Sequence, residues 1–287
     1  MKKDRRIKNI SGLNQIMIDI KPDRCDSDVY INSDVDVTNL VEYMKKLKVA
    51  NKDITYFHAF ITALAKTIYN RSKLNYYVRN RHLYEHRDIV ISFVAKISFD
   101  DKSEEIMLLI PIDEKDNIFS ISKKIKDKVD YIRSKKEGNI SKKGANNAID
   151  ILGKLPNILR VPIVGVLKIC DKFGILPRKL VKDNLYYSSI IVSNLGSIKC
   201  GAIYHNITNF GTCSGLITFG EIKLKEIIDK NGNKNIRSVC EIGVNLDERI
   251  ADGYYFAKSL KLLEYILDNP KLLEEECSKI IEVSETH

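Results

Sequence analysis

The stretch Leu246-Asp247-Glu248-Arg249-Ile250-Ala251-Asp252-Gly253 joins the two clearest elements of the sequence. Before it, residues 238–246 alternate apolar and polar side chains, a pattern typical of a half-buried strand. After it, apolar residues recur at helical spacing up to Pro270, so we expect a final helix that packs on the core. The charged residues therefore follow directly from the end of a strand and precede a helix.

The rest of the sequence predicts strands and helices in mixed order. Alternating or β-branched runs predict strands at residues 29–37, 89–99, 107–112, 189–193, 216–222 and 238–246. Helical spacing predicts helices at residues 38–47, 54–68 and 120–136, and we expect Thr38 to cap the first of them. This order indicates an α/β (α+β) two-layer sandwich with a mixed sheet. We expect a single domain over residues 1–287, with an N-terminal arm at 1–20.

Composition bounds the class of protein. The 287 residues are 44% hydrophobic and 30% charged, as in ordinary globular proteins. The start of the sequence is polar and basic, and no apolar run reaches the length of a membrane span, so we expect a cytoplasmic protein. The six cysteines include no C-x-x-C pair and no histidine at zinc-ligand spacing, which predicts no metal site.

The net charge of +9 is concentrated in one segment. Residues 140–182 hold nine Lys or Arg against only Asp150 and Asp171. Because no RNA-binding, zinc-finger or helix-turn-helix signal accompanies this charge, we expect no nucleic acid partner. Three of the six prolines fall in the same region, so we interpret residues 144–183 as an apolar, basic insertion built from a pair of short helices.

The stretch at 246–253 resembles the D-H-R-x-x-D-G signature of 2-oxoacid dehydrogenase acyltransferase (E2) catalytic domains and the H-x-x-x-D-G of chloramphenicol acetyltransferase. Asp247, Arg249, Asp252 and Gly253 match, but the position of the catalytic histidine carries Glu248. Three further blocks match in order, namely 35–40, a region from Phe57 to Ala95, and Val192-Ser193-Asn194-Leu195-Gly196. The resemblance covers about residues 5–273, although no lipoyl domain is expected.

The resemblance implies a chloramphenicol acetyltransferase-like fold assembled as a homotrimer. In that assembly an acyl-coenzyme A and a small acceptor enter a channel between subunits from opposite sides. By position, Ser193 inherits the hydrogen bond to the oxyanion, contributed from the neighbouring subunit. Asp252 inherits a structural role in fixing the loop, with Arg6 or Arg249 as its partner. The acceptor is not identified by the sequence.

Glu248 leaves the chemistry open. A carboxylate has an ordinary pKa of about 4.3 and an imidazole one of about 6.5, so glutamate is the poorer base toward a thiol unless a dry channel raises its pKa. His205, twelve residues beyond Ser193, is an alternative source of the imidazole, against the plainer interpretation of a hydrogen-bonded loop residue. Three other histidines, His58, His82 and His86, are expected to be structural.

Two hypotheses for the function follow. The first is a coenzyme A-dependent acyltransferase (class EC 2.3.1) that acts by direct attack in a ternary complex, with Glu248 or His205 as base. The second is a catalytically degenerate trimeric scaffold or acyl-coenzyme A-binding protein. Residues 144–183 pack against the trimer, form a lid over a long acyl chain, or make a peripheral contact with an anionic membrane.

Overall fold

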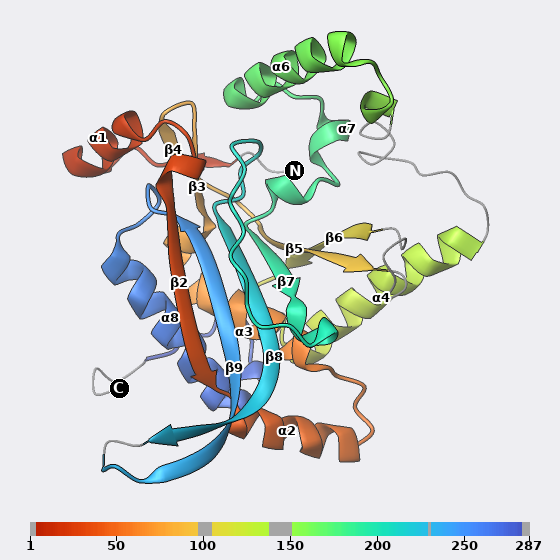
Figure 1. The fold of residues 1–287 in the computed structure, drawn as a ribbon, viewed down its shortest axis with the longest axis vertical. Helices are drawn as coiled ribbons and strands as arrows, with labels where there is room; N and C mark the ends of the chain where they lie inside the picture. The colour runs from red at the N-terminus through yellow and green to blue at the C-terminus, as the bar shows by residue number, and fades with distance from the viewer. Residues whose placement is uncertain (1–3, 97–104, 138–150, 229–230, 283–287) are drawn as a thin grey trace.

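A mixed six-stranded sheet with the order β2-β9-β8-β7-β5-β6 forms the centre of the protein (Figure 1). The computed structural model describes residues 4–96, 105–137, 151–228 and 231–282. The strands are β2 (Asp28–Asp36), β5 (Ile89–Lys96), β6 (Glu105–Ile112), β7 (Ile190–Asn194), β8 (Gly215–Ile228) and β9 (Lys234–Asp247). Strand β7 runs parallel to both β5 and β8, and the other neighbours are antiparallel. The predicted α/β sandwich with a mixed sheet is confirmed.

Four helices provide the other layer. They are α2 (Thr38–Val49), α3 (Tyr56–Asn70), α4 (Ile118–Glu137) and α8 (Gly253–Asp268). Helix α3 is buried from His58 to Ile68 because it lies against the middle of the sheet. Two aromatic pairs join it there: Phe57 meets Phe93 of β5 edge to face at 4.8 Å, and Phe60 stacks on Phe219 of β8 at 4.3 Å.

The starts of two helices depend on different caps. The Thr55 hydroxyl accepts from the His58 amide, and the His58 ring accepts in return from the Thr55 amide, which closes a capping box on α3. Helix α2 begins at Thr38 rather than after it, so the predicted capping role of Thr38 is wrong. The Asp36 carboxylate accepts from the Thr38 amide instead, and the Thr38 hydroxyl accepts from the Ser238 amide of β9.

The N-terminal stretch contributes to a small second sheet. Strand β1 (Arg5–Arg6) pairs with β4 (His82–Glu85), which pairs in turn with β3 (Tyr76–Arg79). Helix α1 (Gly12–Ile20) follows, with Ser11 accepting from the Asn14 amide as its cap. The first three residues of the expected arm lie outside the described part of the chain.

Residues 199–214, which we call the covering loop, cross the face of the sheet that the helices leave open (Figure 1). Ile217 and Phe219 are buried in the core, so Thr218 between them points to the opposite face. There the Thr218 hydroxyl donates to the Ile203 carbonyl at 3.0 Å. Further along, the Ile207 amide donates to Asp28 at the start of β2.

The insertion contains one long helix, α6 (Asn157–Phe173), and the short α7 (Arg178–Val181). Residues 151–153 are helical as well, and Pro156 and Pro177 lie directly before α6 and α7, as expected of prolines that separate helices. The expectation is wrong at Pro162, which lies inside α6 instead of ending it. Pro162 is the sixth residue of the helix, and the chain continues helically past it. Residues 144–150 of the insertion lie outside the described residues. In the described ranges, none of the helices has the length and apolar character to span a bilayer.

Candidate active site

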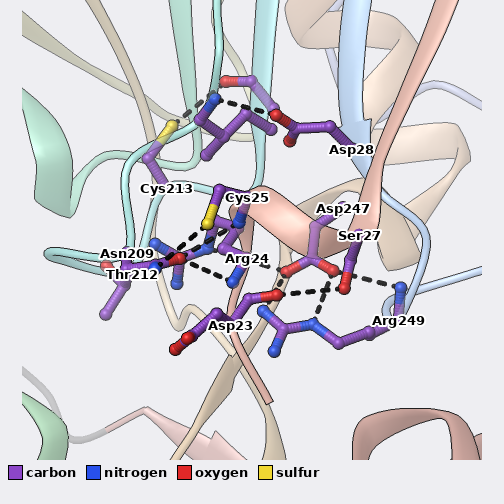
Figure 2. A network of polar contacts seen from close by, with 12 residues as sticks. Asp23, Arg24, Cys25, Ser27, Asp28, Asn209, Thr212, Cys213, Asp247 and Arg249 are labelled. Atoms are coloured by element: carbon purple, nitrogen blue, oxygen red, sulfur yellow. Dashed lines mark hydrogen bonds and ion pairs between the residues drawn. The ribbon is translucent and has the colours of Figure 1, made fainter. Parts of the chain in front are cut away.

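The turn after β9 is built on a buried carboxylate. Asp247 ends the strand and is fully buried. Arg249, two residues on, grips it with two hydrogen bonds, from Nε to Oδ1 at 2.8 Å and from Nη2 to Oδ2 at 2.7 Å (Figure 2). Such a paired arrangement is geometrically specific because the guanidinium fork matches the carboxylate. These two hydrogen bonds hold in place the turn that carries Glu248.

A second buried arginine, Arg24, faces the same carboxylate. Its Nε lies 3.6 Å from Asp247 Oδ2 (Figure 2). Its Nη1 and Nη2 donate to the carbonyls of Thr208 and Gly211 in the covering loop at 2.8 and 3.1 Å. Burial lowers the pKa of Arg24, and the charge of Asp247 acts in the opposite direction. Arg24 therefore joins the turn at residues 247–252, which we call the motif turn, to the covering loop. Arg24 is not among the residues expected from the sequence, because no local pattern marks it.

The remaining donors of Arg249 reach back to the N-terminal region. Its Nη1 donates to the carbonyls of Lys21 and Pro22, directly after α1, at 3.0 and 2.9 Å. Arg6 bonds the ring of His82. Both arginines suggested as partners of Asp252 thus have other partners.

Asp252 is exposed and caps α8, accepting a hydrogen bond from the Tyr255 amide at 2.8 Å. Its carboxylate thereby fixes the start of the helix that follows the turn. This is a structural task, performed on the backbone rather than on a basic side chain.

Glu248 lies at the outer side of the turn. Its amide donates to the Ser27 carbonyl at 2.9 Å, which holds the backbone in place. Its side chain keeps 29% of its surface exposed, and Oε1 lies 2.6 Å from the ammonium of Lys21. Glu248 is therefore a carboxylate in an ion pair, partly open to solvent.

Ser193 lies far from Glu248 within one chain. It is half-buried near the end of β7 and is opposite Thr218 of β8, which is opposite Gly243 of β9. Glu248 is five residues beyond Gly243, a separation of about 17 Å along the strand direction alone. One copy of the chain therefore does not bring these two side chains together.

His205 lies in the covering loop. Its neighbours are tied to β2, because the ring of Tyr204 packs edge to face on Tyr30 at 5.3 Å and Asn206 accepts from the Tyr30 hydroxyl at 2.7 Å. The Nε2 of His205 is buried and has no hydrogen-bond partner within the described residues. This nitrogen keeps its hydrogen-bonding capacity unused, but it is covered by the rest of the chain.

The structure supplies no ligand set for a metal in its described ranges, where no three His, Cys, Asp or Glu side chains gather closely enough to hold one. The cysteines there are free thiols. Burial raises the pKa of Cys240 to about 12, which keeps that thiol protonated and unreactive.

Comparison with known proteins defines the class of fold. Residues 176–274 match the model of the 2-oxoacid dehydrogenases acyltransferase (catalytic domain). No curated protein matches the sequence. The predicted resemblance to this acyltransferase family is confirmed over the matched segment, which contains both Ser193 and the turn with Glu248.

Solved structures extend the likeness to nearly the whole chain. A probable dihydrolipoamide acetyltransferase of Listeria monocytogenes 4b F2365 has a TM-score of 0.59 and 16% identity, covering 92% of this chain and 94% of its own. The dihydrolipoamide acetyltransferase (E2p) of Azotobacter vinelandii has a TM-score of 0.60 and 14% identity, with 93% of each chain covered. A chloramphenicol acetyltransferase has a TM-score of 0.52 and 12% identity, covering 92% and 100%. At these identities the likeness establishes the fold.

Proposed function

We propose that the protein binds an acyl-coenzyme A between copies of the chain and transfers the acyl group directly to a small acceptor. The observation that carries the proposal is the motif turn itself. Asp247 and Arg249 form its buried support, while Glu248 between them is turned outward with 29% of its side chain exposed. The fold is that of coenzyme A-dependent acyltransferases, which supports the choice of donor.

The site needs a second copy of the chain. Because Ser193 and Glu248 are separated by about 17 Å along the strands of one copy, a site that contains both takes Ser193 from one subunit and Glu248 from the next. A homotrimer, as the resemblance implies, provides such interfaces. In the Azotobacter vinelandii enzyme a serine, a histidine and an asparagine have been investigated for roles in the catalytic mechanism.

In the proposed reaction, Glu248 takes a proton from a hydroxyl, thiol or amine acceptor as that group attacks the thioester carbonyl. The Ser193 hydroxyl donates a hydrogen bond to the oxyanion that forms. Collapse of the intermediate breaks the carbon–sulfur bond, and the departing coenzyme A thiolate takes up the proton from Glu248. His205, with its free Nε2, is the alternative base.

A second candidate function is an acyl-coenzyme A-binding protein without turnover. The ion pair between Glu248 and Lys21 favours it, because a carboxylate held by an ammonium at 2.6 Å is already engaged. Its negative charge also opposes the thiolate and oxyanion that a reaction would generate nearby. Both candidates require binding of the thioester, but only the first requires chemistry.

Release of free coenzyme A thiol from acetyl- and longer acyl-coenzyme A, measured against thiol, hydroxyl and amine acceptors, distinguishes them. If Glu248 is the base, Glu248→Gln lowers the rate by about 10²–10⁴. The control Glu226→Gln removes another glutamate of a Glu–Lys pair, on the distant β8–β9 hairpin, and leaves the rate unchanged. Binding without thiol release, with activity created by Glu248→His, establishes the second candidate. Absence of thioester binding by calorimetry contradicts both.

Mixing inactive copies tests the shared site. Ser193→Ala and Glu248→Gln chains are produced together, so that about a quarter of the interfaces in a mixed trimer combine an intact Ser193 with an intact Glu248. Activity that returns in the mixture, but in neither variant alone, supports a site between subunits. A mixture as inactive as its components contradicts it.

A further inference from the structure

Helix α6 has an apolar surface that no other described residue of the chain covers. Its outward positions are apolar along almost the whole helix, and the exposed fraction reaches 81% at Ile158 and 64% at Val161. Further along, Val166, Ile169 and Phe173 are each more than half exposed. Figure 1 shows α6 at one end of the molecule, away from the layer formed by α2, α3 and α8. Surfaces of this kind mark an interaction site.

The opposite side of α6 is held by a specific polar anchor. Asp171, the buried acid of the helix, accepts from the Tyr187 hydroxyl at 2.6 Å and from the Gly211 amide of the covering loop at 2.8 Å. Gly174 then ends the helix in the left-handed region, with φ of 69°. The anchor fixes which side faces the protein, so the apolar side is held outward.

The exposed charges on this segment are all of one sign. Between residues 151 and 182 the sequence has seven Lys or Arg, and Asp171 is its one acid. Because Asp171 is turned inward, the exposed charges within residues 151–182 are basic, and the nearest exposed acid in the described part of the sequence is Asp183, after the last of them. Arg160 and Lys168 also border a shallow groove of about 350 Å³ on α6, with Gly165 between them.

The exposed apolar and basic side chains of α6 together indicate which kind of partner binds this surface. Contact between the α6 segments of two copies would bring like charges together, because most of the net charge of +9 lies in residues 140–182. An anionic bilayer offers the opposite charge together with apolar acyl chains, the two features that an interfacial helix needs. At 1.5 Å per residue the helix is about 25 Å long, which suits a helix lying in the plane of the interface.

We propose that α6 is a membrane-docking surface that lies on an anionic phospholipid bilayer. Val161, Val166 and Ile169 enter the boundary between headgroups and acyl chains, and Lys168 and Lys172 meet the lipid phosphates. The contact places the proposed acyltransferase site next to a lipid surface, but it does not depend on catalysis.

Flotation of the full chain with vesicles tests the proposal. We expect co-flotation with phosphatidylcholine–phosphatidylglycerol vesicles, loss of it at high salt, and none with phosphatidylcholine alone. The double variant Val166→Glu, Ile169→Glu abolishes flotation. The matched control Leu224→Glu, Ile236→Glu changes two equally exposed apolar residues on the β8–β9 hairpin, and it floats like the unaltered chain.

The basic residues are tested separately. Lys168→Gln with Lys172→Gln lowers the vesicle partition coefficient by about thirtyfold, since each basic residue near the surface contributes about fivefold. The charge-preserving Lys168→Arg with Lys172→Arg keeps it. Circular dichroism confirms that each variant is folded.

Three outcomes overturn the proposal. They are absence of flotation with anionic vesicles at low salt, unchanged flotation of the folded Val166→Glu, Ile169→Glu variant, and an oligomer that loses mass in that variant without any flotation of the unaltered chain. The last result would assign α6 to contact between copies of the chain.

Discussion

Strand β9 presents two different surfaces to the rest of the protein. Over its last eight residues the side toward the helices is apolar and carries Cys240, Ile242, Val244 and Leu246. Toward the covering loop it carries Gly243, Asn245 and Asp247, and these are buried as well. Burial of polar groups costs free energy unless each finds a partner, so the second face is the more expensive to build. The comparison teaches that the polar face of β9, rather than the apolar core, organises the candidate site.

The largest effect is expected from the buried carboxylate on that face. Asp247→Asn keeps the shape but removes the charge that Arg24 and Arg249 share, leaving two guanidinium groups buried without their counter-ion. We expect a loss of about 3–5 kcal/mol in the free energy of unfolding, measured by urea denaturation.

The control is Asp34→Asn, which breaks the exposed pair with Lys225 and costs about 0–1 kcal/mol. If Asp247→Asn is no more costly than this control, the buried arginines do not depend on Asp247.

The helix side contains a titratable group of its own. Burial, with the nearby charge of Lys126, lowers the pKa of His58 to about 4. An unfolded histidine titrates near 6.5, so the contribution of neutral His58 to the free energy of unfolding is fully present above that pH. It is lost as the pH falls toward 4, by at most about 3 kcal/mol.

His58→Gln supplies a side-chain oxygen to the Thr55 amide without titrating, so it should flatten this pH dependence in urea denaturation between pH 7 and 4, a window of about three units. The control His82→Gln should leave the slope as it is. An equally steep slope in His58→Gln would assign the acid sensitivity to other groups.

A smaller effect is expected where β9 meets the covering loop. A Cβ on Gly243 would lie 2.6 Å from the Thr218 hydroxyl and 3.3 Å from Ala202 Cβ, so Gly243→Ala must push the loop outward. We expect a loss of about 1–3 kcal/mol and faster proteolysis within residues 199–214.

Gly12→Ala, where a Cβ would meet nothing within 4 Å, serves as the control and should cost nothing. Unchanged proteolysis of Gly243→Ala would mean that the loop adjusts without loosening.

The smallest effect belongs to the exposed pair of the site. Lys21 and Glu248 each keep about 30% of the side chain exposed, so solvent screens their attraction. A double-mutant cycle with Lys21→Gln and Glu248→Gln should give a coupling energy of about 0–1 kcal/mol in thermal unfolding. A coupling energy above about 2 kcal/mol would mean that this pair is as poorly screened by solvent as the buried pair of Asp247 and Arg249.

Periodicity in the sequence was sufficient to predict the sheet and its core side. The alternation in residues 238–246 places Cys240, Ile242, Val244 and Leu246 on one face, and all four are buried. It could not predict that the other face is covered too, because the covering loop reaches it through bonds between distant residues, such as Thr218 to Ile203. Local patterns therefore predicted which face is apolar but not which face is buried.

The candidate site was only partly accessible from the sequence. Its turn was identifiable because the strand ends directly at Asp247. The Lys21–Glu248 pair joins residues 227 positions apart, and Arg24 acts through contacts with two distant segments, the covering loop and Asp247, so neither has a local signal. Arg6 or Arg249 was expected as the partner of Asp252, whereas Arg249 binds Asp247 and Arg6 binds His82.

The hydrogen bond from the Gly211 amide to Asp171 limits how the α6 segment can be deleted or exchanged. Gly211 in turn accepts from Arg24, which faces Asp247, so four bonded residues run from α6 to the turn that holds Glu248. A Cβ at Gly211 would overlap the Tyr186 carbonyl oxygen at 2.2 Å, so this position has no room for a side chain. Excising α6 as a cassette would therefore disturb the motif turn as well, and a chimera that exchanges this segment between relatives must carry the acid and its glycine together.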